Sequence, residues 1–224
     1  MGIFVNEAGD TTKCSIGILV MENVQNVSSE DKLMLVKQEL EGMIRSKYGQ
    51  VTRGDLKTLH PLDAYISYYK KFGYTYHVLP QLKSVINGKP IPDGLPLVEV
   101  MFMTEIKNML LTAGHDLDKI KIPMSLKVST GSESFTAING KNVTTIPNDI
   151  MITDQENVIS SILRGPDLQT AITAQTTRVI YTVYAPSGVE EQLVLEHLRD
   201  IESYIRIVSE KSVTCLNQVF DGMR

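Results

Sequence analysis

The pattern of apolar and polar positions changes character about halfway along the chain. In the first half, apolar residues recur every three or four positions, as at Leu33, Val36 and Leu40, which predicts amphipathic helices. In the second half, short runs rich in β-branched residues alternate with turn sequences such as Asn139-Gly140, which predicts strands joined by hairpins. Helices are expected near residues 30–48, 61–72, 78–86, 97–111 and 189–210, and strands near 3–5, 14–21, 124–130, 134–138, 143–146, 149–153, 158–163 and 178–184.

Helices followed by strands, without regular alternation, predict an α+β fold. We expect a single domain over residues 1–224, with helices in the first half around a buried central helix, a mostly antiparallel sheet in the second half and a long C-terminal helix. A capping-box sequence at residues 28–31 marks the start of the first helix. The early runs at 3–5 and 14–21 are expected to pair with each other across a turn at residues 8–10.

The central helix is predicted from a run that is apolar on nearly every side. Pro96 stands at a position suited to the first helical turn, and the apolar residues continue to Leu111. A helix that is apolar all round is either buried or spans a membrane. Glu99, Glu105 and Lys107 interrupt the run before it reaches the ~20 apolar residues that a bilayer requires. We therefore expect a buried helix around which the rest of the fold packs.

Composition and charge are those of a cytoplasmic globular protein. Cys14 and Cys215 are too few for a disulfide framework and are expected as free thiols, although a single bridge between them is the alternative. The first twenty residues lack the basic-then-apolar order of a signal peptide, and no membrane anchor is expected.

The net charge of −4 conceals a basic segment at residues 45–89, which carries +6, so that the remainder carries −10. This segment also holds six of the nine tyrosines. Basic residues interleaved with aromatic ones suit RNA, since cations follow phosphates and rings stack on bases. The alternative is a pair of amphipathic helices with solvated lysines and inward-packed tyrosines. The residues proposed for RNA contact are Lys70, Lys71, Tyr74, Lys83 and Lys89.

Most sequence motifs for catalysis are absent. The chain has no glycine-rich phosphate loop, no cysteine or histidine spacing typical of a metal site and no nucleophile elbow, so neither metal nor cofactor is expected. Two segments remain. His115-Asp116 follows the central helix and suits either general-base chemistry or a simple loop and cap. The threonine-rich segment at residues 164–177 suits either ligand binding or a set of side-chain turn bonds.

The sequences IPDGLPLVEV at residues 91–100 and HDLDKI at 115–120, followed by the strand runs and the threonine-rich segment, resemble a known family. They are similar to the tRNA-binding and editing domain of the phenylalanyl-tRNA synthetase beta subunit, especially its free-standing bacterial relatives. The resemblance covers residues 61–211 and is strongest at residues 91–120.

This resemblance implies hydrolysis of tyrosine wrongly esterified to the phenylalanine tRNA, by an oriented water without metal or covalent intermediate. The chain departs from the family's pocket at three places. Ala113 stands where the family has a histidine, Met101-Phe102 stand where it has a threonine-asparagine pair, and no acid matches its later glutamate near Gln169 or Ala171. The tyrosine-reading pocket is therefore not reproduced.

The function expected from the sequence is binding of tRNA or aminoacyl-tRNA, with deacylation of a mischarged ester as the open enzymatic question. The alternative is a non-catalytic module for a small amino-acid-like ligand. The catalytic residues are unknown, the candidates being His115, Asp167 and Thr170. A cleft between the central helix and the threonine-rich segment is expected to be lined by Asp93, Glu99, His115, Asp116, Arg164, Asp167, Thr170 and Thr173.

Overall fold

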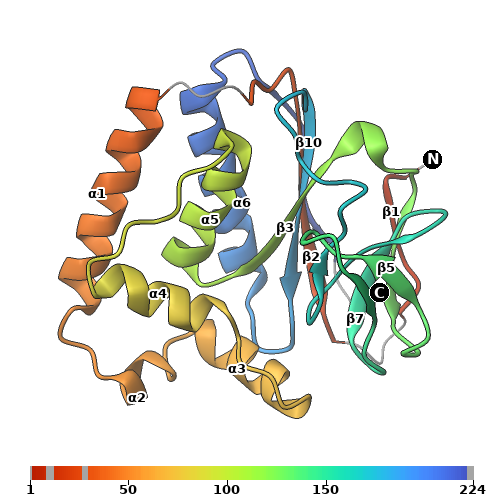
Figure 1. Ribbon diagram of the computed structural model, residues 1–224, viewed down its shortest axis with the longest axis horizontal. Coiled ribbons are helices and arrows are strands. Elements are labelled where there is room, and N and C mark those ends of the chain that lie inside the picture. The colour runs from red at the N-terminus through yellow and green to blue at the C-terminus, as the bar shows by residue number, and fades with distance from the viewer. Residues whose placement is uncertain (1, 9–12, 27–29, 221–224) are drawn as a thin grey trace.

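The protein is built in three layers, with a central sheet between a helical layer and a second, outer sheet (Figure 1). The computed structural model describes residues 2–8, 13–26 and 30–220. The helices are α1 (Glu30–Tyr48), α2 (Arg53–Leu56), α3 (Leu62–Lys71), α4 (Val78–Ile86), α5 (Pro96–Asn108) and α6 (Glu191–Val208), with a 3₁₀ turn at Leu117–Lys119. The predicted α+β class is confirmed, as are the central helix and the long helix near the C-terminus.

The central sheet has the antiparallel order β11-β2-β10-β3 and joins segments from both ends of the chain. Its strands are β11 (Val213–Phe220), β2 (Ser15–Glu22), β10 (Arg178–Ala185) and β3 (Leu111–Asp116). Strand β10 is buried at every residue after Arg178, because helices cover one of its faces and the outer sheet covers the other. Burial on both faces explains why its sequence is a continuous apolar run without alternation.

The outer sheet has the order β1-β4-β7-β8-β9 and is antiparallel except for the β1–β4 pair. Its strands are β1 (Phe4–Asn6), β4 (Met124–Val128), β7 (Ile150–Thr153), β8 (Val158–Ser161) and β9 (Gly165–Pro166). A hairpin of β5 (Ser134–Thr136) and β6 (Asn142–Thr144) turns at Asn139-Gly140, as predicted. The hairpin packs over a small core of its own beneath Phe135.

Helix α6 lies directly on the central sheet and anchors the helical layer to it. Gly17 of β2 makes this close approach possible, since a Cβ atom there would lie 2.4 Å from Cγ1 of Val194. The apolar stripe of α6 that includes Leu198, Ile201 and Ile205 is fully buried against the sheet and helix α5. The hydrophobic pattern of this helix therefore correctly predicts its buried face.

The predicted pairing of the two N-terminal strands is wrong. Both strands form, but β1 pairs with β4 in the outer sheet, whereas β2 lies between β10 and β11 in the central sheet. Residues 16–21 of β2 are apolar and buried, so β2 needs neighbours on both sides within the core, which the short strand β1 does not supply. The expected turn at 8–10 and capping box at 28–31 include residues that lie outside the described part of the chain.

Within the described residues, no helix combines the length and the apolar character needed to cross a bilayer.

Candidate ligand pocket

A pocket of about 430 Å³ lies between helix α5, strand β3 and the turn that joins β8 to β9. Its walls are mostly apolar and include Val98, Met101, Phe102, Leu111, Ala113, Ile162, Leu163 and Ile172. The exposed residues among its lining, Tyr74, Thr75, His77 and Ile138, mark its opening. This volume is within the range of about 300–1,000 Å³ that is typical of small-molecule sites.

Helix α5 contributes one stripe of side chains to this pocket. Val98, Met101, Phe102 and Glu105 follow the spacing that places residues on one face of a helix. The opposite face, which includes Val100 and Met103, is fully buried. The central helix is thus buried on most sides. Some of its apolar residues, which the sequence predicted as core, line the pocket instead.

The helix is also shorter than predicted, since it ends at Asn108 instead of Leu111. Met109 adopts the left-handed conformation, with φ of 62°, and its N–H donates to the carbonyl of Glu105 at 2.7 Å. The chain then reverses into strand β3, which holds Leu111 and also His115-Asp116. A continuous apolar run does not distinguish a buried helix from a buried strand, so the expected loop at His115 was wrong.

Glu105 is the buried acid of the pocket. Glu105 is 2% exposed, and its Oε1 accepts the N–H of Thr112 at 2.8 Å, which ties the helix to strand β3. Burial raises the pKa of Glu105 to about 8, against the opposing effect of the Thr112 hydrogen bond. The carboxyl group therefore holds its proton at neutral pH.

His115, Asp167 and Thr170 meet between the two sheets, further along β3. Nδ1 of His115 lies 2.7 Å from Oγ1 of Thr170, and that hydroxyl donates to Oδ1 of Asp167. Because the hydroxyl proton goes to Asp167, Nδ1 of His115 carries a proton, and burial lowers the pKa of this imidazole to about 4. None of the three side chains lines the pocket. The structure brings these catalytic candidates together, but in a sealed position.

Asp116 and the threonine-rich segment form a second set of structural bonds. Oδ2 of Asp116 accepts the hydroxyl of Thr176 at 2.8 Å, and Oδ1 accepts the N–H of Asp118 at 3.2 Å. The carbonyl of Thr173 accepts from Asn26 at 2.8 Å. These contacts are the turn and cap bonds that formed the alternative interpretation of this segment.

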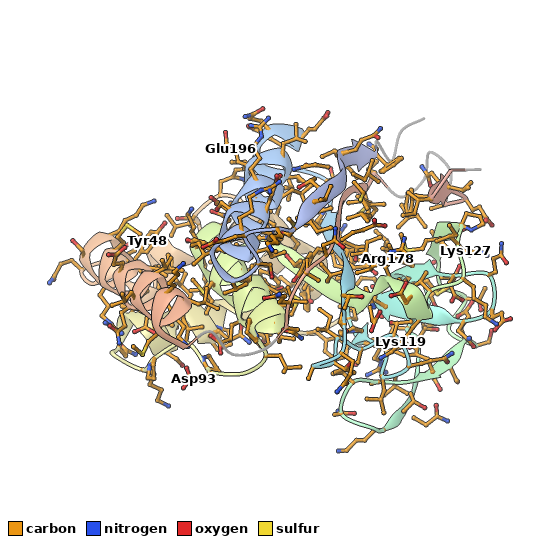
Figure 2. The ribbon with its side chains drawn as sticks, turned by 90° about the horizontal axis from the view of Figure 1, so that it is seen from above. Tyr48, Asp93, Lys119, Lys127, Arg178 and Glu196 are labelled. Carbon is orange, nitrogen blue, oxygen red and sulfur yellow. The ribbon has the colours of Figure 1, made fainter. Side chains whose placement is uncertain are left out.

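Asp93 and Glu99 point away from the pocket, toward helix α1. Both hydrogen-bond to Nζ of Lys37, Glu99 at 3.1 Å, and Asp93 is largely exposed on the helical side of the molecule (Figure 2). Burial opposes the charge on Lys37, but the hydrogen bonds that Nζ donates to Asp93 and Glu99 outweigh this effect and raise the pKa of the lysine. The expected role of these two acids at the cleft entrance does not match their positions, because they hold α1 to the start of α5.

Arg164 is the predicted ligand-pocket residue that does line this pocket. Its Nε donates to the carbonyl of Thr144 at 2.9 Å, which fixes the guanidinium near the opening. No carboxylate of the described residues lies within ion-pair distance of it. This positive charge is available to an anionic part of a ligand.

The tyrosines of the basic segment are mostly core residues. Five of the six are buried: Tyr48, Tyr65, Tyr68, Tyr69 and Tyr76. Tyr74 differs, since it is 44% exposed and borders the pocket opening. Lys70 and Lys71 are exposed at the end of the helix that leads to Tyr74, whereas Lys83 lies on α4 and Lys89 just after it. Lys70 and Lys71 therefore lie close in sequence to the one exposed ring of the segment.

Cys14 is a buried free thiol and Cys215 an exposed one, which confirms the expected absence of a bridge between them. No three histidine, cysteine or acidic side chains gather as metal ligands in the described ranges.

Glu105 is the site residue that sequence reasoning missed. The available signal was an acid within the apolar run, at the spacing that places it on the same face as Met101 and Phe102. The run interrupted by Glu105 was used to exclude a membrane span, but the same interruption indicates a polar group placed in an apolar environment.

The comparisons with known proteins concern the part of the chain that supplies most of the pocket lining. Residues 96–203 match the family model of the B3/4 domain, which is of the phenylalanyl-tRNA synthetase beta-subunit type. This match includes α5, β3 and the β8–β9 turn.

Among solved structures, the chain is similar to an N-terminal fragment of the phenylalanyl-tRNA synthetase beta subunit from Pyrococcus horikoshii. The sequences are 16% identical, the TM-score is 0.45, and the match covers 56% of this chain and 47% of that one. No curated protein matches the chain significantly. The resemblance to the synthetase beta-subunit domain is thus confirmed by the B3/4 match over residues 96–203.

Proposed function

We propose that this protein binds the aminoacyl end of a charged tRNA, with the amino-acid side chain in the pocket beside α5. The observation that carries the proposal is the pocket itself, which draws most of its lining from the B3/4 match and has apolar walls and a volume suited to an aminoacyl group. Met101 and Phe102 offer dispersion contacts to an apolar side chain. Arg164 and the basic surface at Lys70 and Lys71 suit the phosphates that follow.

The direct experiment uses an amide-linked analogue, 3′-phenylalanylamino-3′-deoxyadenosine, which cannot hydrolyse. Calorimetry should detect binding to the wild-type protein, and Met101→Gln should weaken it because a polar amide enters an apolar wall. Met43→Gln is the matched control, since Met43 is 58% exposed on α1 and outside the pocket. Equal loss in both variants, or no binding to the wild type, would remove the pocket from the proposal.

Lys70 and Lys71 test the RNA part of the proposal. Replacing both with glutamate should weaken tRNA binding and reduce the slope of log K against log salt, because fewer counterions are released. Lys32→Glu with Lys57→Glu is the control, since both lysines are exposed elsewhere in the helical layer. Unchanged affinity and salt slope in the Lys70 and Lys71 variant would locate the RNA elsewhere.

Hydrolysis is a separate activity, measured on a panel of correctly and wrongly charged tRNAs that begins with tyrosine on the phenylalanine tRNA. Rapid loss of one species would make the protein a deacylase. Stable esters, together with binding of the amide-linked analogue, would make it a binding protein. Stabilisation by a free amino acid alone, with no response to the analogue, would favour the small-ligand alternative.

A further inference from the structure

One oxygen of Glu105 has a structural role and the other has none. Oε1 accepts the N–H of Thr112. No hydrogen bond from the described residues reaches Oε2, and no lysine, arginine or histidine among them pairs with this carboxyl group. The side chain is 2% exposed and lines the pocket. An acid at this depth without a cation is costly to keep ionised, so its retention needs a reason.

Support of the fold does not supply that reason. The bond to Thr112 requires a single acceptor oxygen, which a glutamine at position 105 would provide without the cost of a buried acid. The neighbouring pocket residues Val98, Met101 and Phe102 offer it neither donor nor charge. The titratable groups that face it are the hydroxyls of Tyr65, Tyr69 and Tyr76, and each of these donates to a backbone carbonyl. We therefore expect the ligand to supply the hydrogen-bond donor that Oε2 of Glu105 lacks.

We propose that Glu105 receives the α-ammonium group of the bound aminoacyl ligand. The proposal rests on the function argued above and narrows its substrate class to primary amines that carry a large apolar side chain, as in α-amino-acid esters and amides. An ammonium supplies the missing positive charge and donors for Oε2, and the ion pair gains strength in an apolar, water-poor site. The apolar walls take the side chain, while Arg164 lies at the opening, where the phosphate-bearing end would leave.

The arrangement makes binding depend on the proton of Glu105. Since burial keeps this carboxyl protonated at neutral pH, an incoming ammonium must displace that proton. Binding below about pH 8 should therefore release protons to the buffer, and a ligand without the amino group should release none.

A pair of small probes tests the proposal. L-Phenylalaninamide and 3-phenylpropanamide differ only in the amino group. Calorimetry at pH 6.5, in two buffers of different ionisation enthalpy, should show proton release and about tenfold or more tighter binding for the amine. In Glu105→Gln the preference and the proton release should both be lost. Glu39→Gln, an exposed change on α1, should keep both.

The outcomes separate this proposal from the function on which it rests. If both probes bind the wild type equally, or if Glu105→Gln keeps the amine preference, Glu105 is not the ammonium receptor, and the pocket proposal stands. If neither probe nor the amide-linked adenosine analogue binds, the proposed function itself fails. Circular dichroism of Glu105→Gln checks that the variant is folded, and the probe pair on the wild type remains decisive without it.

Discussion

Two buried polar sites lie beside strand β3 and differ in whether a pocket adjoins them. In the first, Thr170 bridges His115 and Asp167, and Asp167 also accepts the N–H of Thr170 at 3.0 Å. In the second, Glu105 has one backbone donor and a pocket beside it. Only the first site has the residue types of a catalytic cluster, and apart from Nε2 of His115 its polar side-chain atoms are paired with one another. We therefore expect an incompletely paired group beside a cavity to be the better indicator of ligand binding.

Glu105 and His115 should also respond to pH with opposite sign, and Glu105 gives the largest effect. The folded protein keeps the Glu105 proton up to about pH 8, whereas the unfolded chain loses it near the ordinary value of 4.5. Between these values the unfolded state binds fewer protons, so the free energy of unfolding falls as pH rises, by up to about 1.4 kcal/mol per pH unit. Glu105→Gln should remove this loss.

Urea denaturation of the wild type and Glu105→Gln between pH 4.5 and pH 8.5 measures this pH dependence of the free energy of unfolding. The variant should have a larger free energy of unfolding than the wild type. The difference should grow as pH rises and become constant above about pH 8. Glu39→Gln should show no growing margin, because Glu39 is exposed. A constant difference across the range would mean that Glu105 is ionised in the folded protein and already paired.

Mutation within the sealed His115–Asp167–Thr170 site should lower the free energy of unfolding. Thr170→Val preserves the shape of the side chain but leaves Asp167 and Nδ1 of His115 without their shared hydroxyl. Buried groups left unsatisfied cost about 1–3 kcal/mol, so a fall of about 2–3 kcal/mol in the free energy of unfolding is expected.

Thr136→Val is the matched control, since Thr136 is exposed on β5 and its change should be nearly neutral. Ligand binding by the folded Thr170→Val protein should be retained, because Thr170 does not line the pocket. A variant with normal stability and no binding would reverse the roles assigned to the two sites.

The fold was largely predictable because its elements follow hydrophobic periodicity. Helix α4 at Val78–Ile86 begins and ends where the pattern placed it, and the Asn139-Gly140 hairpin formed at its turn sequence. Strand β11 was missed because it lies at the edge of the central sheet, half-exposed, and pairs with β2 from the far end of the chain. Such long-range pairing leaves little local signal.

The site was less predictable, since residue type says little about whether a group is already paired. His115, Asp167 and Thr170 were named from the sequence as catalytic candidates, but their mutual hydrogen bonds depend on how the two sheets pack. Glu105 was passed over because its importance lies in the partner it lacks. Arg164 was found because a positive charge in a polar segment is visible in sequence.

The smallest expected effect, an absence of titration, tests whether the sealed site is closed to water. Burial lowers the pKa of His115 to about 4 and that of His197 to about 3. Both folded pKa values lie below the ordinary value near 6.5, so these histidines lower the free energy of unfolding as pH falls from 6.5 toward 4, opposite to Glu105.

The ring ¹⁵N shifts of His115 and His197 should therefore stay constant between pH 8 and pH 5, while a free histidine peptide in the same tube titrates. Resonances are assigned with His115→Asn and His197→Asn. A His115 midpoint near the ordinary value would mean that its unpartnered Nε2 reaches solvent, and the contrast between a closed cluster and an open pocket would no longer hold.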